Sequence, residues 1–512
     1  MGGEGSAEAV VVGQRIVRRR AEFSRQGAVW ANSMSVKRRQ GSGDQKDLFD
    51  QALQASLRHG ATGEGGTGPG ACAEPQAFAA WEQQRALTQM LMEEVASSAN
   101  LNQAYKRVKA NKGAAGVDAM SVAALLPWLR ENRERLIAAL LDGSYQPKTV
   151  RGVEIPKPGG GTRQLGIPTV VDRLVQQAIL QVLEPILDPT FSSSSFGFRP
   201  GRSAHQALAQ AQTYVADGRE TVVDIDLEKF FDRVNHDILM ARLARRIGDK
   251  RLLRIVRRFL EAGMMQAGVC IERHEGTPQG GPLSPLLANL LLDDLDKELE
   301  RRGHRFCRYA DDCNIYVRSE AAGERVMVSV VAFLEGKLRL KVNRAKSAVA
   351  PVMERSFLGY RLLPGGRLGL APKSLDRVKE RLRRITRRNR GIALERMIAE
   401  VNSFTTGWVT YFRHAACKSA LRDIDDWLRR KLRCVRLKQC KRAKSIADFL
   451  VKCGVPARRA WPLAVTGKGW WRRSGSPPAN EAMTLQWFAQ LGLVSLQAHH
   501  AALQSAGNRR VR

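Results

Sequence analysis

Two adjacent carboxylates, Asp311 and Asp312, lie between short apolar stretches in the segment RFCRYADDCNIYV, which runs from Arg305 to Val317. The flanking residues favour β-strands, and Asp-Asp followed by Asn314 is typical of a turn. The segment therefore predicts a β-hairpin with both acids at its tip. Carboxylates clustered in apolar surroundings cost free energy unless a cation or hydrogen-bond donors meet them. A solvated turn without a function is the alternative, and only the rest of the chain can decide between the two.

A third carboxylate, Asp226, ends a different predicted strand. The segment TVVDIDLEKFFD (221–232) begins with the apolar residues of a buried strand, and a period of two places Asp224 and Asp226 on one face. If this strand neighbours the hairpin in one sheet, the three acids converge. Mg²⁺ prefers such oxygen-rich sites, where water and substrate phosphates complete its coordination. Two such ions could activate a 3′-hydroxyl and stabilise a leaving pyrophosphate, so the predicted chemistry is nucleotidyl transfer, with Mn²⁺ as the alternative ion.

Three further segments could contact the substrate of such a site. The segment VEIPKPGGGTRQLGI (153–167) predicts a hairpin with a flexible tip, and its cations Lys157 and Arg163 could close over phosphates. An exposed surface hairpin is the alternative. The loop GTPQGGPLSP (276–285) allows close backbone approach to a ligand and presents Gln279 as its polar group.

The loop SSSSFGFRPGR (192–202) interleaves Phe196 and Phe198 with Arg199 and Arg202. Arginine and aromatic side chains in one loop suit base stacking and phosphate contact. A loop pinned to the core by its two phenylalanines is an equally simple explanation.

The composition favours a polyanionic partner. The 512 residues include 83 Lys and Arg against 50 Asp and Glu, a net charge of +33. Such a balance predicts nucleic acid bound through its phosphates, with an anionic membrane surface as the alternative. No apolar run approaches the roughly 18 residues of a spanning helix, and the N-terminus lacks a signal-peptide core. We therefore expect a cytoplasmic protein, with association with the nucleoid left open. The eight cysteines include no CxxC pair, so neither a zinc site nor a disulfide framework is expected.

Basic charge concentrates in a predicted helical region from Lys373 to Lys444, which has 22 Lys and Arg against 7 Asp and Glu. This one-sided balance and the interleaved aromatic residues predict contact with nucleic acid. The basic segment GKGWWRRSGSPP (467–478) is expected to be a loop with the same role. The candidate contact residues of these two segments are Arg383, Arg384, Arg387, Arg388, Trp408, Arg472 and Arg473.

Taken in order, the motifs resemble those of bacterial group II intron-encoded reverse transcriptases/maturases over about residues 91–496. The motifs that carry the resemblance are KRVKANKGAAGVD (106–118), IPKPGGGTRQLGIPTVVDR (155–173), FGFRPGRSAHQAL (196–208), VDIDLEKFFDRVNHD (223–237), GTPQGGPLSPLLANLLLDDLD (276–296), RYADD (308–312), LKVNRAKS (340–347) and FLGY (357–360).

This resemblance implies an α+β fold: a right-hand polymerase, with fingers and an antiparallel palm sheet, followed by an α-helical thumb or maturase domain. The linker-like composition of residues 1–75, which match none of these motifs, predicts a poorly structured extension. For the rest of the chain the boundaries are N-terminal helices and fingers at 76–225, the palm at 226–362 (fingers and palm together about 100–362), the thumb at 373–445, a basic RNA- or DNA-binding segment at 446–498 and a tail at 499–512.

The resemblance also implies roles for single residues. Asp226, Asp311 and Asp312 fall on the catalytic, metal-binding aspartates. Phe231 falls on the aromatic gate that disfavours a ribose 2′-hydroxyl, and Gln279 falls beside the nascent base pair. The remaining residues implied to bind the dNTP are Lys157 and Arg163, near the triphosphate, and Lys346, at the position of a general acid for pyrophosphate.

The implied function is RNA-directed DNA polymerisation together with binding of the intron RNA to assist splicing and mobility. The expected partners are intron RNA, an RNA template with a DNA or RNA primer, and target DNA; no membrane partner is expected, and the oligomeric state is left open. A non-catalytic RNA-binding splicing cofactor and a domesticated or defence-associated reverse transcriptase are the alternatives. The chain departs from many relatives in lacking the Cys/His cluster of a zinc-type endonuclease domain.

Overall fold

The computed structural model describes residues 88–156, 161–266 and 269–509. The predicted extension at 1–75, Lys157 and the hairpin tip around it lie outside the described residues. The described chain forms two compact units. The first unit comprises 88–211 and 221–350, and the second unit comprises 212–220 and 351–509.

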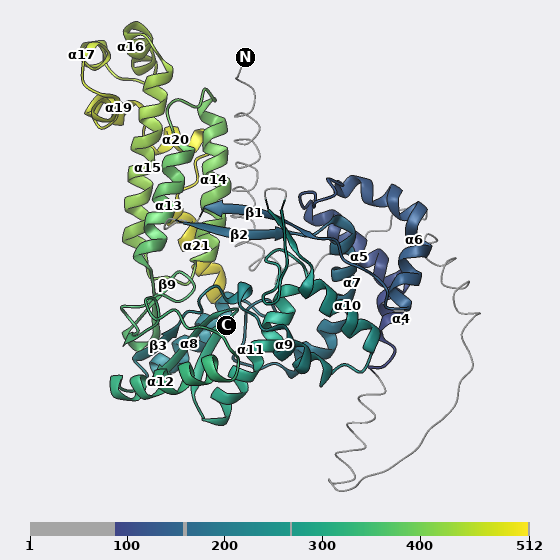
Figure 1. Cartoon of the computed structure of the whole chain (residues 1–512). Helices are drawn as coiled ribbons and strands as arrows, with labels where there is room; N and C mark the ends of the chain where they lie inside the picture. The colour runs from purple at the N-terminus through teal and green to yellow at the C-terminus, as the bar shows by residue number, and fades with distance from the viewer. Residues whose placement is uncertain (1–87, 157–160, 267–268, 510–512) are drawn as a thin grey trace, which may run out of the picture. The chain divides into compact units, whose positions relative to one another are not determined.

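Helices provide most of the core of the first unit (Figure 1). One of the two longest, α7 (Val170–Leu187), begins where the Thr169 side chain accepts a hydrogen bond from the Asp172 amide, and it packs against α4 and α5. Its apolar residues recur on every side, which explains why it is buried along most of its length. The other helices of this unit are α4 (Leu91–Ala96), α5 (Ser98–Asn111), α6 (Leu125–Leu141), α9 (His236–Ala244), α10 (Lys250–Glu261), α11 (Ser284–Arg301) and α12 (Glu320–Gly336), and α8 (Ala204–Ala216) continues into the second unit.

A four-stranded sheet with the order β6-β7-β3-β8 carries the acidic residues. Its strands are β3 (Thr221–Ile225), β6 (Arg305–Tyr309), β7 (Asp312–Val317) and β8 (Ala348–Pro351). The predicted hairpin is confirmed: β6 and β7 are antiparallel, and β7 also pairs antiparallel with β3. Helix α12 packs against β3 and β7, and α11 packs against β6.

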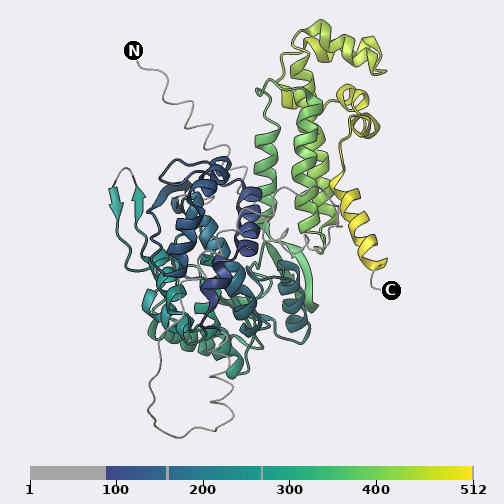
Figure 2. The same cartoon turned by 90° about the vertical axis from the view of Figure 1, so that its right-hand side faces the viewer.

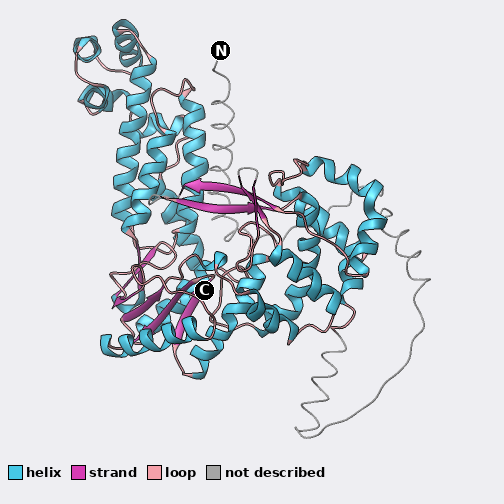
Figure 3. Ribbon diagram, viewed as in Figure 1, coloured by secondary structure: helices cyan, strands magenta, loops and turns pink. Residues whose placement is uncertain are grey.

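A second sheet of the first unit contains the predicted basic hairpin. Strands β1 (Val150–Pro156) and β2 (Thr162–Ile167) are antiparallel, and they are the long pair of magenta strands in Figure 3. The sheet order is β2-β1-β4-β5, with β4 (Met264–Gln266) and β5 (Val269–Ile271) completing it.

The second unit is a short β-hairpin followed by helices. Strands β9 (Tyr360–Leu363) and β10 (Arg367–Leu370) precede three long helices that run side by side, α13 (Pro372–Ile385), α14 (Leu394–Tyr411) and α15 (Lys418–Gln439) (Figures 1 and 2). Leucines on one face of α15, Leu421, Leu428 and Leu432, are almost completely buried, while its arginines lie between them. The chain then forms α16 (Ala443–Lys452), α17 (Ala457–Val465), α18 (Trp470–Ser474), α19 (Pro477–Ala482), α20 (Leu485–Gln490) and α21 (Leu496–Arg509).

Two expectations for this unit differ from the structure. The segment 467–478, predicted as a loop, contains α18 and the start of α19. Helix α18 packs against α15, and its Ser474 is buried. The residues predicted as a tail continue α21, which packs against α14 and α15 through its buried residues Leu496 and His500. Within the described residues, no helix combines the length and the apolar character that crossing a membrane requires.

Candidate active site

The turn between β6 and β7 presents two carboxylates. Tyr309 pairs with Asp312 across the hairpin, so Ala310 and Asp311 form a tight turn between them. Ala310 adopts a positive φ of 60°, a conformation that residues other than glycine adopt at a cost. Asp311 is half-buried, whereas Asp312 keeps more exposure to solvent.

Asp226 follows β3 directly and faces this turn. Ile225 pairs with Cys313, and continuing this register by one residue places Asp226 beside Asp312. The Asp226 amide donates to Ser347 Oγ at 3.0 Å, and its carbonyl accepts from the Asn343 amide at 2.8 Å, so the 343–347 turn holds its backbone. Neighbouring strands thus bring the predicted acids together, as the period-two pattern and the hairpin required.

The three acids affect one another electrostatically. Burial raises the pKa of Asp311 above its ordinary value; Arg163 opposes this shift, and the negative charge of Asp226 adds to it. The pKa of Asp312 is raised to about 7, first because the surrounding protein displaces water from the carboxylate and then because Asp311, Asp224 and Asp226 are negative. Such mutual repulsion favours the binding of a cation.

The oxygen donors of this cluster fit a hard cation such as Mg²⁺. Asp226 Oδ2 is buried and accepts no hydrogen bond within the described part of the chain, although the Lys346 ammonium forms an ion pair with it at 3.2 Å. Among the described residues no group of three or more His, Cys, Asp or Glu side chains is already gathered closely enough to hold a metal ion. The carboxylates fit Mg²⁺ by the chemistry of their oxygens and lie on neighbouring strands, and water and phosphate oxygens would supply the remaining ligands.

Two of the predicted nucleotide-binding residues contact each other. Arg163 Nε, from β2, donates to Gln279 Oε1 at 2.5 Å, and the Gly166 amide donates to the Gln279 carbonyl at 2.9 Å. The basic hairpin and the 276–285 loop are therefore joined at Gln279. Arg163 is exposed, so its guanidinium remains accessible to a ligand.

Phe231 is attached to the same loop through its backbone. It lies in a short 3₁₀ turn (Phe230–Asp232), where its ring contacts Phe230 edge-on. Its carbonyl accepts a 2.6 Å hydrogen bond from the Thr277 amide, and the Gly276 amide donates to the Val234 carbonyl at 2.7 Å. The position of the half-buried Phe231 ring therefore depends on the conformation of the 276–285 loop.

Arg199 lies in a different environment from the one predicted. Its side chain is only 5% exposed and pairs with Asp188 at 2.6 Å. Its remaining donors bond the carbonyls of Asp188, Ser192 and Ser195. These bonds turn the Arg199 guanidinium toward the protein rather than toward solvent, and its contact with nucleic acid stays a prediction.

The two phenylalanines of the 192–202 loop also differ from each other. Phe196 is buried, with the Arg202 guanidinium above its ring, whereas Phe198 is 44% exposed. The loop is thus pinned to the core by one phenylalanine, and Arg202 keeps partial exposure.

Most of the predicted nucleic-acid contacts of the second unit are accessible. Arg472 is exposed, as are the four arginines at the end of α13, namely Arg383, Arg384, Arg387 and Arg388. Trp408 is half-buried, with its ring 4.7 Å from that of Phe412. Arg473 bonds the carbonyls of Thr466 and Lys468, so part of its side chain holds its own loop.

Sequence reasoning missed two groups. One is Arg308, which lies beneath the acidic turn and is fully buried; an arginine inside an apolar strand was its only sequence signal. The other is a group of cation–π contacts in the second unit. Arg430 lies 4.2 Å from the centre of the Trp471 ring, and Lys431 lies 5.6 Å from the centre of the Trp427 ring. Lys and Arg placed near tryptophan in a basic region was the available signal.

Comparison with known proteins agrees with this geometry. Residues 155–362 match the family model described as reverse transcriptase (RNA-dependent DNA polymerase), and residues 375–454 match that of the group II intron, maturase-specific domain. Protein YkfC of Escherichia coli (strain K12) is 34% identical over 304 residues, which cover 51% of this chain and 80% of that protein.

Group II intron-encoded protein LtrA of Lactococcus lactis subsp. cremoris is 37% identical over 195 residues, which cover 38% of this chain and 32% of LtrA. Among solved structures, one titled as a partial Cas6-RT-Cas1–Cas2 complex is 28% identical over 49% of this chain and 43% of that chain, with a TM-score of 0.33. The acidic sheet lies inside the reverse transcriptase match, and the maturase match covers α14, α15 and all but the first three residues of α13. The chain belongs to the family of group II intron-encoded reverse transcriptases and maturases.

Proposed function

We propose that this chain copies RNA into DNA at Asp226, Asp311 and Asp312, and that its helical second unit binds intron RNA to assist splicing and mobility. The observation that carries the proposal is that these three acids lie at adjacent ends of the neighbouring strands β3, β6 and β7, where their charges act on one another, inside the region that matches reverse transcriptases. A purely RNA-binding splicing cofactor would not need this cluster of mutually repelling carboxylates, so the non-catalytic alternative is not favoured.

Each side chain has a defined part in the proposed reaction. The three carboxylates would hold two Mg²⁺ ions, which would supply positive charge for the attacking 3′-hydroxyl and the departing pyrophosphate. Arg163 holds the triphosphate, with Lys157 as its proposed partner from the hairpin tip. The ammonium of Lys346, beside Asp226 and largely exposed, can deliver a proton to the leaving pyrophosphate.

Two residues would select the nucleotide. The Phe231 ring would occupy the space that a ribose 2′-hydroxyl needs, so dNTPs would be preferred over rNTPs. Gln279, held by Arg163 and by the Gly166 amide, would contact the nascent base pair. Their attachment to one loop supports a common role, since a movement of that loop would displace both.

The second unit would bind RNA through its basic face. The segment 373–444 contains 22 Lys and Arg against 7 Asp and Glu, and the four exposed arginines at the end of α13 are available to phosphates. The indoles of Trp427 and Trp471, interleaved with cations, suit stacking on unpaired bases.

Primer extension on an RNA template with dNTPs and Mg²⁺ tests the polymerase. We expect the wild type to extend the primer and Asp311→Asn to lose at least about 100-fold of the rate, because a neutral amide binds Mg²⁺ poorly. Asp217→Asn, which changes an exposed aspartate of the second unit, is the matched control and should keep full activity. A wild type that incorporates no nucleotide would refute the proposed function.

A further inference from the structure

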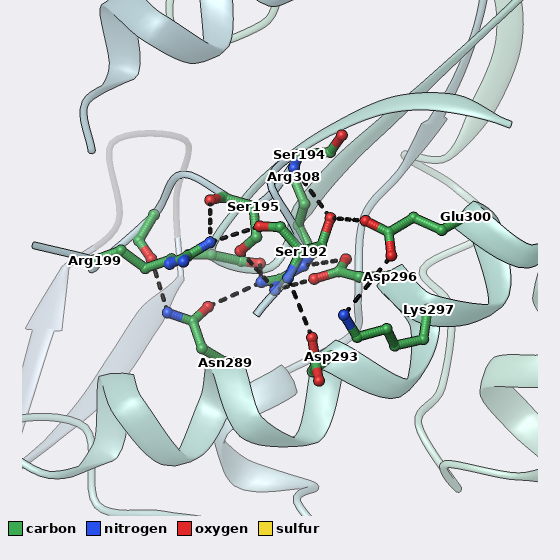
Figure 4. Close-up of polar contacts among 12 residues, drawn as sticks. Ser192, Ser194, Ser195, Arg199, Asn289, Asp293, Asp296, Lys297, Glu300 and Arg308 are labelled. Carbon is green, nitrogen blue, oxygen red and sulfur yellow. Dashed lines mark hydrogen bonds and ion pairs between the residues drawn. The ribbon is translucent and has the colours of Figure 1, made fainter. Parts of the chain in front are cut away.

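The turn that presents the catalytic acids rests on a buried guanidinium. Arg308, on β6, is 1% exposed, and Asp296, on α11, is 0% exposed. Arg308 Nε and Nη2 donate to the two oxygens of Asp296 at 2.7 and 2.6 Å, which is the bidentate geometry of a strong ion pair. Figure 4 shows Arg308 between Asp296 and the serines of the 192–202 loop.

The rest of the guanidinium is occupied as well. Nη2 also donates to Ser195 Oγ at 2.8 Å, and Nη1 donates to Asn289 Oδ1 at 3.0 Å and to the Ala310 carbonyl at 2.9 Å. All five N–H donors of Arg308 are therefore satisfied, which a buried cation requires. The bond to Ala310 matters most, because Ala310 is the turn residue with positive φ and it immediately precedes Asp311.

Asn289 and the 192–202 loop also contact the turn. Asn289 Nδ2 donates to the Gly197 carbonyl at 2.8 Å, and Phe196 and Ser194 exchange backbone hydrogen bonds with Arg308 at 2.9 Å each. A Cβ atom on Gly197 would lie 2.3 Å from the Ala310 nitrogen, so the loop touches the turn directly. Three segments distant in the sequence thus enclose the backbone of Ala310.

We propose that Arg308, oriented by Asp296 and Asn289, is a positioning residue that fixes the Ala310 turn and so sets the places of Asp311 and Asp312 relative to Asp226. The inference rests on the proposed polymerase function, which it deepens. Arg308 does not touch the substrate; it acts through the Ala310 carbonyl. A displacement of the acids by about 1 Å is enough to lower a catalytic rate by about 100-fold.

A double substitution separates positioning from stability. Replacing a buried ion pair by apolar residues of similar volume is often neutral for folding, so Arg308→Met with Asp296→Leu is expected to fold. We expect its kcat for dNTP incorporation to fall about 10- to 100-fold with an unchanged KM for primer–template. Amide hydrogen exchange at residues 309–312 should become faster at a temperature where the protein remains fully folded.

The matched control is Arg242→Met with Asp294→Leu. Asp294 lies on the same helix α11 and pairs with Arg242, on α9, at 2.5 Å. Among the described residues, this pair forms no hydrogen bond with Ala310 or with the 192–202 loop. We expect the control to keep the wild-type kcat and the wild-type exchange rate at the turn.

Wild-type kcat together with wild-type exchange in the Arg308–Asp296 double variant would overturn the inference, since the pair would then serve stability alone. If circular dichroism shows that this double variant is unfolded, the single variant Arg308→Lys tests the inference instead. Lysine keeps the positive charge but lacks the forked guanidinium that reaches the Ala310 carbonyl. A wild-type kcat for Arg308→Lys would overturn the inference. A wild-type chain without polymerase activity would instead refute the proposed function, and the exchange measurement would still test the turn.

Discussion

Asp312 is the residue whose pKa is raised both by the surrounding protein, which displaces water from its carboxylate, and by repulsion from neighbouring acids. Its pKa is raised to about 7, whereas the ordinary value for an aspartate is 3.8. Lys346 opposes the shift, but the surrounding protein and three neighbouring aspartates outweigh it. Keeping Asp312 charged in the cation-free protein therefore costs free energy, as expected for a site that binds a cation.

This shift predicts how stability depends on pH. Because the folded pKa lies above the unfolded value, the stability contribution of Asp312 is fully present below pH 3.8 and is lost as pH rises through about 7. In EDTA, Asp312→Asn should raise the Tm by a few degrees at pH 8 and have a much smaller effect at pH 4, measured by thermal unfolding. Asp217→Asn should change the Tm little at either pH. An equal effect of Asp312→Asn at both pH values would contradict the assigned pKa.

At the scale of elements, short connections position the functional side chains, while helices and strands provide the frame. The 276–285 loop holds Gln279 and, through Thr277, the backbone of Phe231. Gly276 makes this possible: its φ is +90°, and a Cβ there would lie 2.9 Å from the carbonyl oxygens of Phe231 and Asp232. The side chain that glycine lacks would therefore push directly against the residue proposed as the gate.

Gly276→Ala tests this connection. We expect a loss of stability of more than about 1 kcal/mol in urea unfolding, because both the positive φ and the contact are unfavourable for alanine. Discrimination between dNTPs and rNTPs, measured as a ratio of kcat/KM, should fall about tenfold because the Phe231 ring moves.

Gly303→Ala is the control for backbone strain alone. Gly303 also has a positive φ, +73°, but a Cβ there meets no atom within 4 Å. The Gly303→Ala variant should lose about 1 kcal/mol of its free energy of unfolding and keep the wild-type discrimination between dNTPs and rNTPs. Equal discrimination in both variants and the wild type would show that the loop does not hold the gate.

At the scale of the whole molecule, charge is unevenly distributed along the chain. Of the net charge of +33, the segment 373–444 carries +15. This segment forms α13–α15, and four of its exposed arginines lie at the end of α13 or just after it. A helical unit with such a face adds affinity for RNA that the carboxylate site, itself negative, cannot provide.

Charge reversal at Arg383 and Arg384 should weaken RNA binding at moderate salt. It should also reduce the slope of log Kd against log salt concentration by about 0.7 to 0.9 for each lost phosphate contact. Filter binding over a salt series measures both quantities. Reversal at Arg254 and Arg301, exposed arginines of the first unit, controls for net charge and should have a smaller effect. Equal losses in the two variants would indicate that overall charge, rather than this face, binds RNA.

The sequence by itself determined the acids, the strands that carry them and the basic helical region. Asp226 followed a period-two apolar strand, and Asp311 and Asp312 lay in a turn between two others; such patterns are local, because backbone geometry fixes which residues share a face. The β6–β7 hairpin and the pairing of β7 with β3 are confirmed.

Only the tertiary structure decided which arginines face a ligand and which face the protein. Arg199 and Arg308 look equivalent to solvent-facing arginines in the sequence, yet both are buried. The acceptors of Arg199 lie within 11 positions of it, but they meet its guanidinium only because the loop between them is irregular. The acceptors of Arg308 include residues far away in the chain, such as Ser195, which is 113 positions from it. A guanidinium is stable in a core only where such groups satisfy its donors, and a periodic sequence pattern does not report that they do.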